Sequence, residues 1–434
     1  MGTILLLCPE PLQPRQQGIG IRFLELARTL ATEHRVILQA PSVALEEDLH
    51  FTVATFREAA LAALLPAVTT VVLHGPIGER YFHALARAGL APGPPLVVDL
   101  YDPFLIENLQ YTPELGDGVY WRDRALLLGQ LARGDFFLAS SEAQRLFYIG
   151  MLVAGGRLTP ALYHADPTLR SLIDVAPFGV RPPPPPGPGL LRGVVTGIEA
   201  GDTVLYFGGV YDWYDPGILL EALESVIPTN PRLRVVFCAT PNPDTTPQQA
   251  MQRLREAARA RGWLERHVFV IPWFAYARRG AVYRDVDLAV VLHRPSLETA
   301  LSLRTRVLDL MNHGVALLAT REGEASRLIE TAGAGRLVAP GDRPGLARAL
   351  SELLADPASR QTMGAAGQRW VQEHLPWERS LAPLLAFCRE PRRQSAGSAP
   401  RAPGRGRRLL DYWRHQGGRA TLRLLVRRLL EFRP

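Results

Sequence analysis

The sequence predicts an α/β protein made of two parallel-sheet domains in tandem. Short apolar segments alternate with helical ones in both halves, and a proline-rich stretch, 181-RPPPPPGPG-189, separates them. Short apolar strands divided by helices are typical of parallel sheets that are covered on both faces. The proline-rich stretch cannot continue a helix or a central strand. We therefore expect domains at 1–180 and 201–390, a linker at 181–200 and a tail at 391–434.

Each predicted strand is an apolar segment followed by a helical one. In the first half these strands are 3–9, 35–41, 51–56, 69–75, 96–101 and 135–141, with the clearest helix at 20–31. In the second half they are 203–209, 234–239, 267–273, 287–293, 315–320 and 336–340, with helices at 216–227 and from Ser302 to Gly314, and closing helices at 357–390. Ligands bind beyond the carboxyl ends of such strands and between domains, so the predicted site is an interdomain cleft.

Composition narrows the function classes. Hydrophobic residues make up 47% of the 434 residues, no run is long enough to span a membrane, and three scattered cysteines make neither a disulfide framework nor a metal site. A bacterial cytoplasmic protein fits best. The net charge is +7, yet the tail from 401 to 434 alone carries +8, so no specific nucleic-acid binding is expected of the body. The segment 406–434 is typical of a basic amphipathic helix on an anionic membrane, and a helix that binds a protein partner or adheres to nucleic acid is the alternative.

Candidate residues in the first domain follow its strands. Arg15, Gly18 and Gly20 lie between the first strand and the first helix, where glycines permit close backbone approach and a helix N-terminus favours an anion. A mobile loop that merely needs glycine explains them equally well. Asp99 and Asp102 end the fifth strand, where a carboxylate can orient a hydroxyl or accept a proton. Capping or a loop hydrogen bond is the alternative.

Candidates in the second domain begin after its first strand. Gly209 ends that strand, and Asp212 and Trp213 follow in a position to line the cleft. A tight turn with a packed tryptophan is the alternative interpretation.

The segment 293-HRPSLETALSLRTRVLDLMNHG-314 concentrates charge at the mouth of a buried strand. Arg306 and Asp309 are neighbours on the expected helix, and Arg304 lies in its first turn. A cation there is unfavourable unless an anion is bound, because guanidinium and helix N-terminus then hold the same phosphate. A surface lattice of ion pairs is the alternative.

Four segments together resemble the retaining nucleotide-sugar glycosyltransferases of the GT-B fold, specifically glycosyltransferase family 4, or group 1, in a divergent bacterial branch. They are 18-GIGIRFLELARTLA-31, 207-FGGVYDW-213, 298-ETALSLRTRVLDLMNHGVALLAT-320 and 369-RWVQEHLPWE-378. The resemblance covers about residues 1–390 and implies two Rossmann-like domains facing across a cleft. It implies that Asp309 binds the donor ribose and that Glu298 contacts the donor sugar, although the two stand eleven residues apart instead of eight.

The expected activity is sugar transfer from a nucleoside diphosphate sugar to a saccharide or lipid-linked acceptor, with retention, without a cofactor and without a metal. No DxD cluster at a strand end indicates a metal, and Arg304 and Arg306 replace the arginine–lysine pair usual after the glycine turn. Glu298, Asp102 and Asp99 are the catalytic candidates. The expected place is the cytoplasm, peripheral to the inner membrane face. A nucleotide-sugar epimerase and a non-catalytic membrane scaffold on the same fold are the alternatives.

Overall fold

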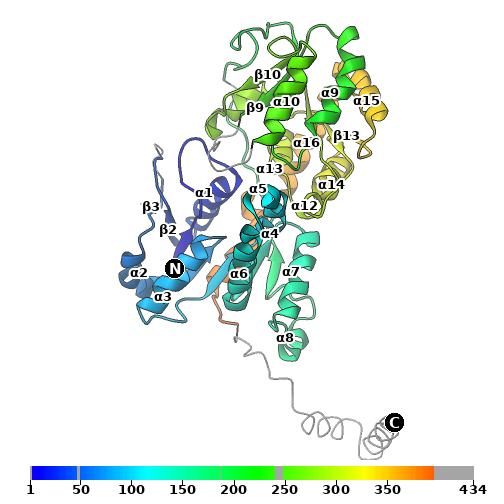
Figure 1. The fold of residues 1–434 in the computed structure, drawn as a ribbon. Helices are drawn as coiled ribbons and strands as arrows, with labels where there is room; N and C mark the ends of the chain where they lie inside the picture. The colour runs from blue at the N-terminus through cyan, green and yellow to red at the C-terminus, as the bar shows by residue number, and fades with distance from the viewer. Residues whose placement is uncertain (1, 46–48, 186, 240–247, 395–434) are drawn as a thin grey trace, which may run out of the picture.

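The computed structural model describes residues 2–45, 49–185, 187–239 and 248–394. Two α/β domains stand one above the other, the N-terminal one below (Figure 1). The predicted amphipathic helix at 406–434 lies outside the described residues, so the membrane role of the tail stays a prediction.

The first domain is built on a sheet that has seven strands within the described residues, all parallel, in the order β3-β2-β1-β4-β5-β6-β7. Its interior strand β1 is buried on both faces, which agrees with its continuous apolar sequence. The strands are β1 (Thr3–Leu7), β2 (Arg35–Ala40), β3 (Thr52–Thr55), β4 (Thr70–Leu73), β5 (Leu96–Asp99), β6 (Phe136–Ala139) and β7 (Ile173–Val175).

The second domain repeats the plan with six parallel strands among the described residues, in the order β10-β9-β8-β11-β12-β13. They are β8 (Thr203–Gly209), β9 (Leu233–Cys238), β10 (Val268–Ile271), β11 (Leu288–Val291), β12 (Leu317–Thr320) and β13 (Gly335–Val338). The predicted fold class is confirmed, and the twelve predicted strands all correspond to strands of the structure.

Helices cover the sheets, and several begin at a side-chain cap that the sequence supplies. Ser141, Asp215 and Asp342 accept a backbone N–H in the first turn of α7, α9 and α15. The first-domain helices are α1 (Gly18–Leu30), α2 (Glu58–Leu64), α3 (Ile77–Arg87), α4 (Phe104–Glu107), α5 (Thr112–Leu115), α6 (Gly118–Arg133), α7 (Glu142–Ala154) and α8 (Pro160–Ala165). The later helices are α9 (Pro216–Val226), α10 (Gln249–Ala260), α11 (Arg279–Tyr283), α12 (Leu297–Leu301), α13 (Thr305–Asn312), α14 (Gly323–Ala332), α15 (Arg343–Ala355), α16 (Pro357–His374), α17 (Trp377–Ser380) and α18 (Ala382–Arg389). Short 3-10 turns are η1 (Leu65–Ala67), η2 (Asn108–Tyr111), η3 (Ile227–Thr229) and η4 (Tyr276–Arg278).

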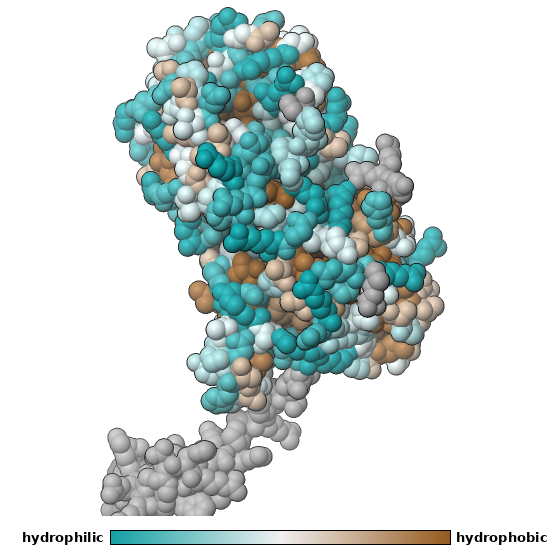
Figure 2. Space-filling view, turned by 180° about the vertical axis from the view of Figure 1, so that it is seen from behind, coloured by the Kyte–Doolittle hydropathy of each residue, from teal (hydrophilic) through white to brown (hydrophobic). Residues whose placement is uncertain are grey.

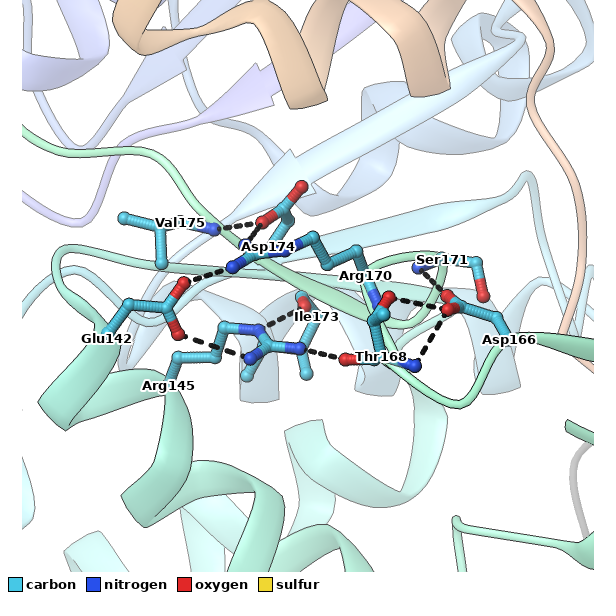
Figure 3. A network of polar contacts seen from close by, with 9 residues as sticks. All are labelled: Glu142, Arg145, Asp166, Thr168, Arg170, Ser171, Ile173, Asp174 and Val175. Atoms are coloured by element: carbon cyan, nitrogen blue, oxygen red, sulfur yellow. Dashed lines mark hydrogen bonds and ion pairs between the residues drawn. The ribbon is translucent and has the colours of Figure 1, made fainter. Parts of the chain in front are cut away.

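Strand β7, which the sequence analysis missed, is fastened to α7 by a polar network (Figure 3). Arg145 donates from Nε to the carbonyl oxygen of Ile173 at 2.9 Å and pairs with Glu142 at 3.2 Å. Arg170 in turn pairs with both Glu142 and Asp174. The Glu142 and Arg145 contacts come from a segment distant in sequence, and the three residues of β7, Ile-Asp-Val, give too weak a signal on their own.

The chain crosses between the domains twice, and the crossings lie side by side. After β7, Val180 donates its N–H to the carbonyl oxygen of Leu375 at 2.7 Å, where the chain returns from α16. Trp377 is buried against Phe178, with 4.8 Å between ring centroids, and a Cβ at Gly179 would come within 2.8 Å of the Trp377 Cα. Glycine is therefore required at the crossing.

The closing helices α17 and α18 pack on the first domain, although the sequence predicts them as part of the second. Phe387 stacks on Phe136 with 5.0 Å between centroids, and Arg389 pairs with Glu33 at 2.6 Å. The end of the predicted linker lies on the second domain, since Asp285 accepts the N–H of Leu191 at 2.7 Å.

The face seen from behind is mostly hydrophilic, with larger hydrophobic patches on the lower, N-terminal domain (Figure 2). Among the described residues, we find no helix with the length and apolar character that a membrane span needs.

Candidate functional site

A cavity of about 280 Å³ lies between the domains, beyond the carboxyl ends of strands from both sheets. This is near the lower end of the roughly 300–1,000 Å³ that ligand sites occupy. Aromatic side chains make up much of its wall: Tyr101, Phe178, Tyr206, Tyr211, Trp213, Tyr214, Trp273, Phe274, Tyr276 and Tyr283. Rings offer flat faces to a sugar or a base, and the predicted interdomain position of the site is where the cavity lies.

The helix predicted from Ser302 to Gly314 is present as the shorter α13, and a separate short helix, α12, precedes it. Ser296 caps α12 by accepting the N–H of Thr299 at 3.0 Å, and that helix ends at Leu301. Helix α13 begins only at Thr305, and no side chain caps its N-terminus. Ser302 is therefore not the cap we expected. Its buried hydroxyl lines the cavity and has no hydrogen-bond partner among the described residues.

Arg306 lies in the first turn of α13 and is held by backbone. Its two terminal nitrogens donate to the carbonyl oxygens of Phe207 and Gly209 at 2.7 and 2.8 Å. Gly208 has φ +80°, and a Cβ there would lie 3.2 Å from the Arg306 Cζ, so the glycine turn makes room for the guanidinium. Arg306 makes no ion pair with any described residue, and it lines the cavity. A partly buried cation beside an uncapped helix N-terminus is a strong attraction for an anion.

Arg304 is already neutralised within the protein. Its terminal nitrogens donate to both oxygens of Glu298 at 2.7 and 2.5 Å, while its Nε donates to Nε2 of His293 at 3.0 Å. Arg304 and Glu298 are 8% and 2% exposed, and Glu298 is outside the cavity wall. Burial, followed by the charges of Arg304 and Arg306, holds the pKa of His293 well below its usual range, so the imidazole is neutral and accepts. Glu298 therefore lies behind Arg304, and its catalytic role stays a prediction that this position does not favour.

Asp309 lines the cavity as predicted, and its carboxylate pairs with Arg279, whose Nε donates at 2.8 Å. The Arg279 guanidinium lies 3.6 Å from the ring centroid of Tyr276, so the pair is braced against an aromatic wall. Its proposed contact with a ribose stays a prediction.

The first domain brings its own helix N-terminus to the same cavity. Helix α1 begins at Gly18 without a side-chain cap, and a Cβ at Gly18 would lie 3.6 Å from the Tyr101 hydroxyl and 3.9 Å from Oγ1 of Thr305. The starts of α1 and α13 therefore face each other. Gly20 donates its N–H to a carboxylate oxygen of Glu10 at 2.8 Å. Arg15 is exposed and is outside the cavity wall.

Three carboxylates of the first domain line the cavity as well: Glu10, Asp102 and Glu107. Burial raises the pKa of Glu10 to about 7, and the negative charge of Asp102 adds to the rise. Burial likewise raises the pKa of Glu107 well above its usual range, with Asp102 as the next cause. Asp102 was predicted, whereas Glu10 and Glu107 were missed. The rule that functional groups follow parallel strands would have found Glu10, three residues after β1.

Two predicted residues have structural partners outside the cavity. Asp99 pairs with Arg22 at 2.6 Å, and both side chains are at most 1% exposed. Asp212 accepts the N–H of Ala250 at 3.1 Å at the start of α10. Trp213, by contrast, lines the cavity and stacks on Tyr211, with 4.8 Å between centroids. The positions thus favour Trp213 over Asp212 as a ligand contact.

The comparisons with known proteins agree with this geometry. Residues 201–356, which run from β8 to the end of α15, match a family model described as "Glycosyl transferases group 1". A search of curated proteins found no significant sequence match. Among solved structures, the sucrose-phosphate synthase of Thermosynechococcus elongatus superposes with a TM-score of 0.61 at 14% identity, covering 90% of this chain and 98% of that one.

Two further structures extend the likeness. Anabaena HepE, in complex with UDP and glucose, gives a TM-score of 0.61 at 18% identity over 89% of this chain and 100% of its own. WaaG, described as a glycosyltransferase involved in lipopolysaccharide biosynthesis, gives 0.56 at 14% identity over 88% and 98%. The fold is GT-B. The segment that matches the family model contains Gly209, Arg304, Arg306 and Asp309. The match supports the assignment of this GT-B chain as a glycosyltransferase.

Proposed function

We propose that the chain is a glycosyltransferase that moves a sugar from a nucleoside diphosphate sugar to an acceptor hydroxyl. Arg306 carries the proposal, because it is a cation without an ion pair among the described residues, at an uncapped helix N-terminus. The family model over the second domain and the GT-B likeness support the same reading.

In this proposal the donor diphosphate binds Arg306 and the first N–H groups of α13. The developing negative charge on the departing diphosphate is what such donors stabilise in the transition state. Arg304 then forms part of the cavity wall, and its attraction for the diphosphate is weakened because Glu298 already neutralises its charge. Asp309 takes the ribose, and Trp213 supplies a flat face. Closure of the cleft excludes the water that would otherwise hydrolyse the donor.

The finer features of the proposal rest on the resemblance of the sequence to family 4. They are retention of the anomeric configuration, transfer without a metal or cofactor, and a saccharide or lipid-linked acceptor. The structures of HepE with UDP and with UDP-glucose make UDP-sugars the first donors to try. A place on the inner face of the membrane, through 406–434, belongs to the same proposal.

The test is a panel of nucleotide sugars followed by thermal shift and calorimetry. Wild-type protein is expected to bind at least one of them, and Arg306→Ala is expected to weaken binding by roughly 10- to 150-fold, as for the loss of one charge-assisted contact of about 1.5–3 kcal/mol. The matched control is Arg327→Ala, because Arg327 is 64% exposed and pairs only at the surface with Glu324.

The outcomes separate the alternatives. If Arg306→Ala binds the nucleotide sugar as tightly as wild type, the donor diphosphate does not bind at Arg306. Isomerised sugar after incubation with donor alone would favour an epimerase, and the absence of any nucleotide binding would favour a non-catalytic scaffold.

A further inference from the structure

The carboxylate of Glu10 occupies a particular position in the cavity. It follows β1, one oxygen accepts the N–H of Gly20 in the first turn of α1, and the residue lines the same cavity as Arg306. This hydrogen bond fixes the carboxyl group and engages only one of its two oxygens. Glu10 is thus a positioned group that the donor site does not use.

Its surroundings favour proton exchange near neutral pH. The charged or titratable groups that interact electrostatically with Glu10 are Asp102, the Tyr211 hydroxyl and the neighbouring Cys8 thiol. Glu107 and Arg279 line the same cavity, as do Arg304, Arg306 and Asp309. Burial raises the pKa of both Tyr211 and Cys8, so these two stay neutral. Burial and the charge of Asp102 raise the pKa of Glu107 well above its usual range, whereas Glu10, with a pKa of about 7, changes charge in the range where a base works best.

A second, independent observation points to a ligand hydroxyl in this cavity. The hydroxyl of Ser302 is 6% exposed, lines the cavity and has no hydrogen-bond partner among the described residues. Buried polar groups are normally paired, so an unpaired one in a ligand-sized cavity indicates a polar ligand. A sugar hydroxyl between carboxylates and aromatic rings fits that description.

We propose that Glu10 accepts the proton of the acceptor hydroxyl during transfer, which makes it a catalytic residue of the reaction; this rests on the proposed function. The bond between the anomeric carbon and the β-phosphate oxygen breaks, and its electron pair leaves with the nucleoside diphosphate. The acceptor oxygen forms the new bond to the anomeric carbon, and its proton moves to the Glu10 carboxylate and then to solvent. The balance is nucleotide sugar plus alcohol giving glycoside, nucleoside diphosphate and one proton.

The experiment compares wild type with Glu10→Gln. Glutamine keeps an oxygen that can accept from Gly20, so the fold of the loop is retained while the base is lost. The substrate is the nucleotide sugar that shifts wild-type melting most, water is the acceptor, and released nucleoside diphosphate is measured from pH 5.5 to 8.5. Glu330→Gln is the control, because Glu330 is 60% exposed and pairs at the surface with Arg321.

The expected result is a fall in kcat of roughly 10²- to 10⁴-fold in Glu10→Gln, with the donor KM nearly unchanged. Activity of wild type and Glu330→Gln should rise with pH through about 7 and level off above it, and Glu10→Gln should lack this rise. A kcat within threefold of wild type with the same pH profile overturns the role of Glu10 alone. Wild type that binds and cleaves no donor overturns the proposed function together with it.

Discussion

Removing the guanidinium of Arg304 should destabilise the protein far more than it changes donor affinity. Arg304 and Glu298 are 8% and 2% exposed, and two hydrogen bonds of 2.7 and 2.5 Å join them. Arg304→Ala leaves the Glu298 carboxylate buried without its partner, which costs about 3–5 kcal/mol. For domains of this size, each kcal/mol lowers Tm by about 2–4 °C, so a fall of roughly 6–20 °C is expected.

The assay is a double-mutant cycle with Arg304→Met and Glu298→Gln, followed by thermal and urea unfolding. The double variant carries no buried charge at this place, so it should be more stable than the sum of the single changes predicts, by about 1–3 kcal/mol. Arg304→Ala melting within 2 °C of wild type, or additive single changes, would refute the reasoning.

Three further predictions concern the glycine turn, the acidic wall and the returning helices. Gly208→Ala should cost about 1–2 kcal/mol for its positive φ and weaken nucleotide binding through Arg306 in calorimetry, whereas Gly193→Ala, with φ +70° and open space, should carry only the strain. Because the pKa of Glu10 is raised from 4.5 to about 7 in the folded protein, ionising this carboxylate between these pH values lowers the stability of wild type. The Tm of Glu10→Gln should therefore exceed that of wild type at pH 8 and equal it at pH 4, and the reverse order would contradict this. Phe387→Ala should cost about 3–5 kcal/mol in urea unfolding by losing its stack on Phe136, and a cost under 1 kcal/mol would show that α18 does not support the first domain.

Most of the sheet could be predicted because its signal is local. Strands such as β8 are apolar runs followed by a glycine turn, and burial on both faces leaves that pattern in the sequence. Strand β7 has only Ile173 fully buried, and ion pairs between Glu142, Arg145 and Arg170 hold it in place. Such contacts depend on tertiary structure, so no local sequence pattern predicts them.

The site was predicted in part for the same reason. Arg306 and Asp309 line the cavity because helical spacing fixed their places relative to a buried strand. The pairing of Arg304 with Glu298 joins the residue before α13 to α12, a separate short helix that the sequence did not predict, so the spacing within one helix could not reveal it. Glu10 and Glu107 were missed because neither belongs to a motif.

The paired crossings at Val180 and Leu375 also set how the cleft can open. A single flexible connection between two domains allows them to rotate relative to each other about any axis. Here two connections run alongside each other, joined by a hydrogen bond and packed around Trp377. We expect them to act as a hinge that restricts domain rotation to one main axis. The starts of α1 and α13 lie on either side of the cleft, so a swing about that axis changes the gap between them while keeping them aligned. Each closure would therefore bring the N-termini of α1 and α13 back to the same relative position.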